Sequence, residues 1–292
     1  MQKVQTAQSV LVTGANGQLG NELRILAPKY TNLQFIFVDI EDLDISDEAA
    51  VEAFLALHKP DFLVNCAAYT AVDKAEDEPD LAYKINRDAV GYLGKAAARH
   101  QTQMVHISTD YVFDGKSYLP YTEDIITSPT GVYGQSKADG EQLLLHVCPN
   151  AIIVRTAWLY SSFGNNFLKT MLRLGRERDS LNVVFDQIGT PTYAADLAQG
   201  LLQIITSEQL IPGIYHFSNE GVCSWYDFTC AIFKLAGIDT QVQAIESKDY
   251  PVKATRPFYS VLNKQKVKTT YNLRIAHWED GLTRCLKALQ EI

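Results

Sequence analysis

Three glycines near the start of the chain constrain its fold more than any other feature. Gly14, Gly17 and Gly20 follow the short apolar run Ser9–Thr13 and open the helical pattern Gln18–Leu26. In this spacing the first glycine permits a tight turn, the second lets a pyrophosphate approach the backbone, and the third lets helix pack on strand. The free N–H groups of the helix would then face an anion. The segment predicts a β–α unit that binds a dinucleotide.

Apolar strand patterns and helical patterns alternate after this turn. The sequence predicts further strands over Gln34–Asp39, Phe62–Ala68, Gln103–Ser108, Ala151–Thr156 and Ile214–Ser218. Helices are expected over residues 46–58, 79–100, 196–206 and 278–289, over the segment that carries Tyr133 and Lys137, and between a capping Ser224 and Gly237. Alternation of this kind with short connections is typical of an α/β, Rossmann-like, doubly wound parallel sheet.

The alternation breaks twice, which predicts two domains. We expect a dinucleotide-binding Rossmann domain formed by residues 1–157 with 193–219. The remaining residues, 158–192 with 220–292, would form a smaller α/β C-terminal domain that binds the substrate. A chain of 292 residues is long enough for two packed domains of this size.

The composition excludes several classes of protein. The net charge of −8 argues against nucleic acid as a routine partner. No apolar run reaches the roughly 18–20 residues of a membrane span, and the N-terminal residues lack the apolar segment of a secretory signal. The five cysteines are scattered without a C-x-x-C pair, which favours reduced thiols. We therefore expect a cytoplasmic protein with neither a disulfide framework nor a zinc site.

An acidic residue ends the second predicted strand. Asp39 follows the glycine turn by about 20 residues, where a carboxylate can accept hydrogen bonds from an adenine-ribose diol. The same charge would repel a 2′-phosphate, so NADH should be accepted, and dual use of NADH and NADPH is expected. Asp44 and Ile45 follow in a loop that either covers the adenine or is an acidic surface segment.

Tyr133 and Lys137 stand four residues apart within a predicted helix. That spacing places both side chains on one face, one turn apart. A nearby ammonium favours the phenolate and lowers the phenol pKa from its ordinary value of about 10. A tyrosine tuned in this way can donate a proton to a developing alkoxide. The pair therefore indicates acid–base chemistry.

Polar and aromatic residues follow the fourth predicted strand, at residues 109–111. Ligands of open α/β sheets bind just outside the carboxyl ends of the strands, so these residues are site candidates. Three other features have plainer interpretations. Asn86 could reach back into the site from the middle of its helix, but we expect it on a solvated helix face. We expect His106 to be a satisfied core residue, and the acidic residues 73–80, apart from Asp73, to be a solvated helix start.

Taken together, these motifs resemble the extended short-chain dehydrogenase/reductase superfamily. The glycine spacing, the strand exit Asn65–Ala68 and the Tyr133-x-x-x-Lys137 pair carry the resemblance. Within the superfamily the chain is most similar to the dTDP-4-dehydrorhamnose reductase family, through stretches at 68–76, 108–113, 155–160, 164–167, 186–192 and 256–257. The resemblance implies reduction of the C4 keto group of a dTDP-linked 4-keto-6-deoxyhexose by NADPH or NADH.

The resemblance also implies roles for individual residues. Thr109, Tyr133 and Lys137 would be catalytic, with Tyr133 protonating the sugar oxygen, Thr109 bonding the carbonyl and Lys137 holding the nicotinamide ribose. The implied cofactor site comprises Gly14, Asn16, Gly17, Gln18, Leu19, Gly20, Asp39, Asp44, Ile45, Ala67, Ala68, Ser108, Tyr111, Tyr133 and Lys137. The implied substrate site comprises Val72, Asp73, Thr109, Asp110, Tyr111, Trp158, Asn165, Asn166, Lys169 and Arg256.

One departure from the family concerns metal binding and assembly. Some members dimerise through a magnesium site built from several glutamates. Glu22 matches one of those positions, whereas Ala195 stands where another glutamate is expected. We therefore expect no bound metal, and the sequence leaves a homodimer open.

Two other functions compete with this interpretation. A sugar-nucleotide 4,6-dehydratase or epimerase would share the fold, the tyrosine and the lysine, but related dehydratases follow the aspartate with a glutamate, where this chain has Tyr111. A non-catalytic regulatory subunit, similar to the beta subunit of methionine adenosyltransferase, would keep nucleotide binding without turnover. The presence of Thr109, Tyr133 and Lys137 argues against the second alternative.

Overall fold

The structure is a computed structural model and describes residues 7–292. The first six residues, in which we expected no secretory signal, lie outside the described residues. Within the described residues a six-stranded sheet has the order β10-β5-β4-β3-β1-β2, and every pairing in it is parallel. Its strands are β1 (Gln8–Thr13), β2 (Leu33–Val38), β3 (Phe62–Asn65), β4 (Gln103–Thr109), β5 (Ile152–Thr156) and β10 (Gly213–His216). The doubly wound fold predicted from the sequence is confirmed.

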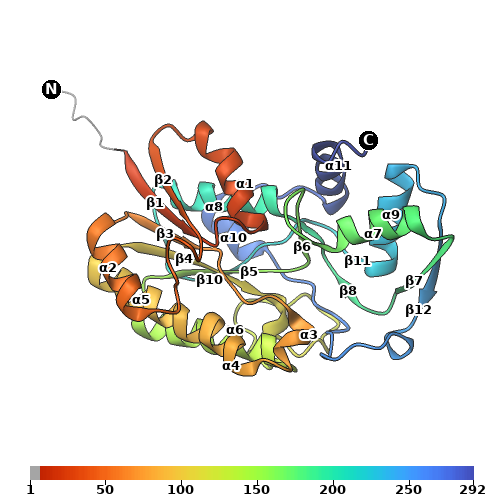
Figure 1. Ribbon diagram of the computed structural model, residues 1–292, viewed down its shortest axis with the longest axis horizontal. Helices are drawn as coiled ribbons and strands as arrows, with labels where there is room; N and C mark the ends of the chain where they lie inside the picture. The colour runs from red at the N-terminus through yellow and green to blue at the C-terminus, as the bar shows by residue number, and fades with distance from the viewer. Residues whose placement is uncertain (1–6) are drawn as a thin grey trace.

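Helices cover both faces of this sheet, as Figure 1 shows. Successive side chains of β1 point to opposite faces, so Val10 and Val12 enter one core and Leu11 enters the other. The first core lies under α1 (Gln18–Leu26), α8 (Ala194–Ile205) and α10 (Gln265–Tyr271). The second lies under α2 (Glu48–His58), α5 (Ala89–His100) and α6 (Val132–Val147). Both faces of a parallel sheet are buried in this way because its crossover helices pack on them.

The segment between β3 and β4 departs from the expected loop and single long helix. A short helix α3 (Val72–Ala75) lies within the expected loop. The expected helix is α4 (Pro79–Tyr83), a π-helical turn over Lys84–Asp88, and then α5. A π turn inserts an extra residue and commonly marks a functional site.

The smaller domain lies on the right in Figure 1 and has its own core, centred on Tyr160, Leu168 and Phe228. Its strands are short: β6 (Leu159–Tyr160), β7 (Ser180–Val184), β8 (Ile188–Gly189), β9 (Thr192–Tyr193), β11 (Cys223–Ser224) and β12 (Gln241–Ile245). Its helices are α7 (Phe167–Glu177), α9 (Trp225–Ala236) and α11 (Trp278–Ala288).

One part of the tail differs from the expected domain division. Helix α10 packs against β10, and Val267, Tyr271 and Leu273 join the core of the larger domain. The sequence assigned this segment to the smaller domain because nothing local distinguishes it from its neighbours. Among the described residues no helix is long and apolar enough to cross a membrane.

Candidate functional site

The glycine turn joins three elements at one edge of the sheet. Gly14 has φ +63°, and a Cβ there would lie 2.6 Å from the backbone nitrogen of Ala67 after β3. A Cβ on Gly20 would lie 2.6 Å from the Cα of Ala15, so only glycine lets α1 approach the turn this closely. Gly17 is the N-cap of α1, and within the part of the chain described no side chain caps that end. The helix N–H groups are therefore available to an anion.

Asp39 lies beside this turn. Its carboxylate accepts the backbone N–H of Asn16 at 2.7 Å, so the acid expected at an adenine ribose does stand next to the glycines. Asp44 instead accepts from the backbone and hydroxyl of Ser46, and Ile45 is buried in the core under α2. Six predicted cofactor residues lie outside the cavity lining of the described structure: Asn16, Gly20, Asp39, Asp44, Ile45 and Ala67.

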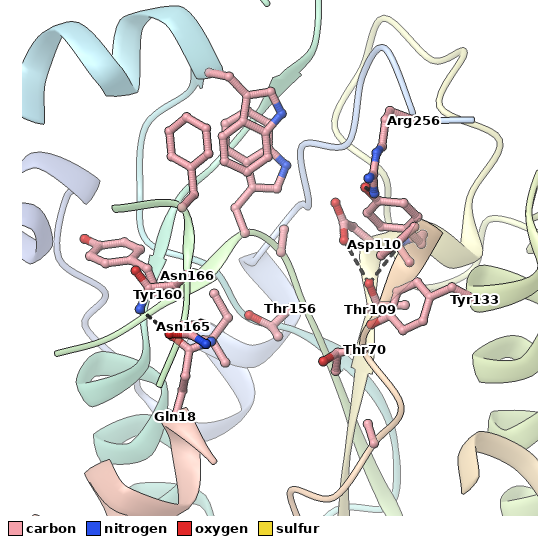
Figure 2. Close-up of a pocket in the computed structure, with 18 of the residues that line it drawn as sticks. Gln18, Thr70, Thr109, Asp110, Tyr133, Thr156, Tyr160, Asn165, Asn166 and Arg256 are labelled. Carbon is pink, nitrogen blue, oxygen red and sulfur yellow. Dashed lines mark hydrogen bonds between the residues drawn. The ribbon is translucent and has the colours of Figure 1, made fainter. Parts of the chain in front are cut away.

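A cavity of about 820 Å³ runs from the glycine turn into the smaller domain. Most of the predicted site residues line it: Gly14, Gly17, Gln18, Leu19, Ala68, Val72, Ser108, Thr109, Asp110, Tyr111, Tyr133, Lys137, Trp158, Asn165, Asn166 and Arg256. Figure 2 shows Thr109, Asp110 and Tyr133 on one side of this cavity, and Gln18, Asn165 and Asn166 on the other. The fold thus gathers residues from both domains around one space.

The carboxyl end of β4 supplies the centre of the site. Thr109 Oγ1 donates to Asp110 Oδ1 at 3.0 Å and accepts the backbone N–H of Tyr111 at 3.3 Å. Asp110 is 2% exposed, and its Oδ2 lacks a hydrogen-bond partner within residues 7–292. Burial raises the pKa of this carboxyl to about 6.

Tyr133 and Lys137 occupy the first two turns of α6 and both line the cavity. The Tyr133 ring meets Tyr111 edge-on, with centroids 5.4 Å apart. Lys137 Nζ donates to the carbonyl of Ile107 at 2.7 Å. Burial lowers the Lys137 pKa to about 8 and raises that of the Tyr133 phenol.

The pKa of Tyr133 is therefore shifted in the direction opposite to the one expected from the sequence. Loss of water around the phenol outweighs any attraction from the lysine, whose head group points to the strand backbone. The raised pKa makes Tyr133 a weaker acid than a free phenol, and its hydroxyl is protonated at neutral pH.

Two residues that the sequence analysis assigned to solvated surfaces help to place α6. Asn86, in the π turn, is fully buried and not on a solvated face; it bonds both backbone groups of Tyr69 and the hydroxyl of Ser136. Glu76, within the acidic run, accepts the backbone N–H of Val132 at 2.9 Å at the start of α6. Both contacts join segments distant in sequence, so no local pattern could have revealed them.

The smaller domain contributes an aromatic wall. The indoles of Trp158 and Trp225 are stacked, with centroids 3.4 Å apart and planes at 8°. Trp158 has φ +47°, and a Cβ on Gly189 would lie 2.6 Å from its ring. Trp225, which also bonds Gln187, was missed because only the fold brings it beside Trp158.

Asn166 bridges the two domains. It is the N-cap of α7, accepting the backbone N–H of Lys169, while its Nδ2 donates to Gln18 Oε1 at 3.0 Å. Asn165 lines the cavity next to it. Lys169 directs its ammonium to the carbonyl of Gly164, outside the cavity lining that the structure describes.

Arg256 closes the far side of the cavity. Its guanidinium donates to Asp73 Oδ2 at 2.5 Å and to the Tyr111 hydroxyl at 3.2 Å. Asp73 thus acts through Arg256, whereas Val72 lines the cavity directly.

The residues present fit a dinucleotide. The uncapped start of α1, the close approach at Gly14 and the acid at Asp39 match a pyrophosphate and a ribose. Farther along, the hydroxyls of Ser108 and Thr156 line the cavity and are buried with no partner among the described residues. Polar groups left unpaired in this way are available to a ligand.

The position that matches a family metal ligand is engaged within the chain. Glu22 is 4% exposed and accepts the hydroxyl of Ser161 at 2.6 Å, and burial raises its pKa. No group of three or more His, Cys, Asp or Glu residues suited to a metal ion occurs in residues 7–292.

Known proteins resemble this chain along its whole length. Residues 8–291 match the RmlD substrate binding domain family. A dTDP-4-dehydrorhamnose reductase from Aggregatibacter actinomycetemcomitans is 44% identical, with 94% of this chain and 96% of that protein covered. The crystal structure of a dTDP-4-dehydrorhamnose reductase from Clostridium acetobutylicum has a TM-score of 0.93 at 43% identity and covers 97% of this chain and all of its own. The corresponding Bacillus anthracis structure, in complex with NADP, has a TM-score of 0.92 at 39% identity, covering 96% and 99%.

Proposed function

This chain belongs to the dTDP-4-dehydrorhamnose reductase family, and from that premise we propose how its cavity carries out the reaction. The enzyme reduces the C4 keto group of dTDP-4-dehydro-6-deoxy-L-mannose with NADPH or NADH and forms dTDP-L-rhamnose. The observation that carries this assignment to the site is the single cavity that joins the glycine turn, the Thr109–Tyr133 centre and the Trp158 wall.

The glycine turn would hold the dinucleotide. The N–H groups at the start of α1 would bind the pyrophosphate, Asp39 the adenine ribose, and Lys137 the ribose nearest the reaction. When bound, the nicotinamide supplies the hydride that is added to C4. The contact of Asp44 and Ile45 with the adenine of the dinucleotide stays a prediction.

Tyr133 would donate the proton. Addition of hydride to the keto carbon leaves an oxyanion, and the phenol of Tyr133 gives its proton to that oxygen, so a hydroxyl forms and a phenolate remains. The phenol of Tyr133 is protonated at neutral pH, so it has a proton to give to the stronger base. Thr109, which already bonds Asp110, would orient the carbonyl beside Tyr133.

The sugar nucleotide would occupy the other half of the cavity. The apolar faces of Trp158 and Val72 suit the deoxyhexose, and Tyr111 would lie between the sugar and the nicotinamide. The guanidinium of Arg256 suits a diphosphate oxygen, with Asp73 fixing its orientation. Asn165, Asn166 and Lys169 are proposed for the nucleotide side.

A dehydratase or epimerase mechanism is less well supported by the residues present. A 5,6-elimination needs a base at C5, and the position after Asp110 holds Tyr111, whose phenol pKa is raised by burial. Such enzymes also regenerate their cofactor within each turnover, whereas a reductase consumes it.

The test is an assay of the purified protein on a dTDP-4-keto-6-deoxyhexose with NADPH and NADH in parallel. We expect one nicotinamide oxidised per sugar reduced, and dTDP-L-rhamnose as the product. Turnover of the sugar without net oxidation of the nicotinamide would contradict the reductase assignment.

We also propose that the enzyme works in the cytoplasm and needs no magnesium, and a homodimer stays an open alternative to a monomer. The location is supported by the charged dinucleotide and nucleotide sugar that it consumes. Sedimentation with and without a chelator tests the assembly; a dimer lost on chelation would contradict the metal-free form.

A further inference from the structure

The helix that carries Tyr133 begins at a residue that cannot cap it. Its N-cap is Gly131, which has no side chain, and Gln135 donates its N–H to the Gly131 carbonyl at 2.9 Å to close the first turn. The N–H groups of Val132, Tyr133 and Gly134 come before this bond, so they depend on partners from outside the helix. Tyr133 therefore lies in a turn that the sequence of α6 does not fix by itself.

A carboxylate from a distant segment supplies a partner for this turn. Glu76 Oε1 accepts the N–H of Val132 at 2.9 Å, although 56 positions separate the two residues. The negative charge also faces the positive end of the helix dipole. Glu76 is half-buried and lies outside the cavity lining that residues 7–292 form, so any effect that it has on the reaction passes through α6.

The glycine at position 131 fits this arrangement. Gly131 has φ −147° and ψ 168°, an extended backbone that any residue can adopt, so its conformation does not require glycine. A Cβ there would lie 2.8 Å from Glu76 Oε1, which is closer than van der Waals contact allows. A side chain at this position would push the carboxylate away from the N–H of Val132. The two positions thus form one cap.

The segment that carries Glu76 also borders the substrate half of the cavity. Helix α3 begins at Val72, which lines the cavity, and Glu76 follows its last residue, Ala75, which is fully buried. Asp73, in the same helix, accepts from the Arg256 guanidinium. One short stretch of chain therefore contacts the substrate pocket at one end and the start of α6 at the other.

We propose that Glu76 is a positioning residue for the reduction, because it caps α6 from the border of the substrate pocket and so places Tyr133 against the sugar carbonyl. A proton passes between the phenol and the carbonyl oxygen only within hydrogen-bond reach, roughly 2.6–3.2 Å. A first turn that shifts loses this reach but leaves the pocket in place. This inference deepens the proposed function and rests on the role given there to Tyr133.

The test compares two variants of Glu76 with the loss of a cap elsewhere. Glu76→Ala removes the acceptor, so kcat should fall about tenfold or more, while the Kd for NADPH and the KM for the sugar nucleotide stay within about twofold. Glu76→Gln keeps an oxygen for Val132 and should keep most of kcat. Asp47→Ala removes the N-cap of α2, which bonds the N–H groups of Ala49 and Ala50, and should lower the Tm similarly with kcat unchanged.

Variants of Gly131 test the shared cap. In the wild type, Gly131→Ala displaces the carboxylate and should lower kcat, whereas combined with Glu76→Ala it meets no carboxylate and should cost nothing further. Gly131→Ser combined with Glu76→Ala offers a hydroxyl at an N-cap, where serine is favoured, and should raise kcat about threefold or more over Glu76→Ala. Amide hydrogen exchange of residues 132–135 should quicken in Glu76→Ala and slow again in the rescued variant, which reports the cap without turnover.

Four results would overturn the inference: a normal kcat in Glu76→Ala, an equal loss in Glu76→Gln, an equal loss in Asp47→Ala, or an equal effect of Gly131→Ala in both backgrounds. Tyr133→Phe in the same assay separates the inference from the proposed function. A near-normal rate there removes the proton donor, whereas a low rate there with a normal Glu76→Ala rejects the positioning role alone. If Glu76→Ala does not fold, a slow Gly131→Ala beside a normal Glu76→Gln sustains the inference, and any other pair of rates overturns it.

Discussion

Arg155 on β5 and Glu141 on α6 form an ion pair that is almost completely excluded from solvent, with 2% and 3% of their side chains exposed. Three N–O contacts of 2.6–3.2 Å join the two groups. The pair ties the sheet to the helix that carries Tyr133 and Lys137, so it fixes the site as well as the fold.

Breaking this pair should cost much stability. Glu141→Gln leaves the Arg155 guanidinium buried without a counter-charge, so the free energy of unfolding should fall by about 3–5 kcal/mol. Urea unfolding measures it. The control is Glu177→Gln, which breaks an exposed i,i+4 pair with Arg173 and should cost less than about 0.5 kcal/mol. Equal losses in the two variants would contradict the prediction.

Removing the Tyr133 hydroxyl should abolish proton donation and little else. Tyr133→Phe should lower kcat by about 10²–10⁴-fold and leave the Kd for NADPH unchanged. Stopped-flow kinetics and fluorescence titration measure the two quantities. Tyr92→Phe, on α5 beside Lys95, serves as the control and should turn over normally. A Tyr133→Phe enzyme of near-normal rate would rule out this proton donor.

The space opposite Trp158 should govern sugar binding. Gly189→Ala adds a methyl group that would lie 2.6 Å from the Trp158 indole, which is too close for van der Waals contact. Trp158 must therefore move from its stack on Trp225. We expect KM for the sugar nucleotide to rise about tenfold or more, with the Kd for NADPH unchanged.

Gly237→Ala controls for the loss of a glycine. Gly237 has φ +63° and no neighbour within 4 Å of an added Cβ among the described residues, so this variant should lose about 1 kcal/mol of stability and keep its KM. An unchanged KM for the sugar nucleotide in Gly189→Ala would show that the position of Trp158 does not govern substrate binding.

Local signals explain which parts of the structure could be predicted from the sequence. The glycine turn, the N-cap Ser224 and the left-handed Gly237 each follow from a residue and its near neighbours, and the helices that they start or end lie where they were expected. The polar exit of β4 at Thr109 was predicted on the same basis, because the strand pattern identifies its own carboxyl end.

The parts that could not be predicted depend on contacts between distant segments. Trp225 stacks on Trp158 although 67 positions separate them, and Asn86 bonds Ser136 across 50 positions. His106 was correctly expected to be buried, but its contact with Lys137 needs the register of β4 against α6. Side chains acquire such partners only after the sheet and its helices have assembled.

Asp110 should make stability depend on pH. Its folded-state pKa is raised to about 6, whereas an unfolded aspartate titrates near 4. The folded protein therefore binds this proton more tightly, and stability is lost as pH rises from about 4 to 6. Asp110→Asn should remove that loss, gaining up to about 3 kcal/mol more at pH 7.5 than at pH 4 relative to wild type. Exposed Asp80→Asn is the control for urea unfolding at both pH values. A pH-independent difference for Asp110→Asn would contradict the raised pKa.

Asp39 should set the balance between the two cofactors. Its carboxylate stands beside the glycine turn, where it favours a ribose diol and repels a 2′-phosphate. Asp39→Asn keeps an oxygen for the N–H of Asn16 but removes the charge, so kcat/KM for NADPH relative to NADH should rise about tenfold or more. Asp44→Asn is the matched control, because the Asp44 carboxylate accepts from Ser46, whereas that of Asp39 accepts from Asn16 in the glycine turn. Steady-state kinetics with both cofactors decide the matter. An unchanged ratio in Asp39→Asn would show that this carboxylate does not face the ribose, and a raised ratio in Asp44→Asn would place the adenine end over the following loop.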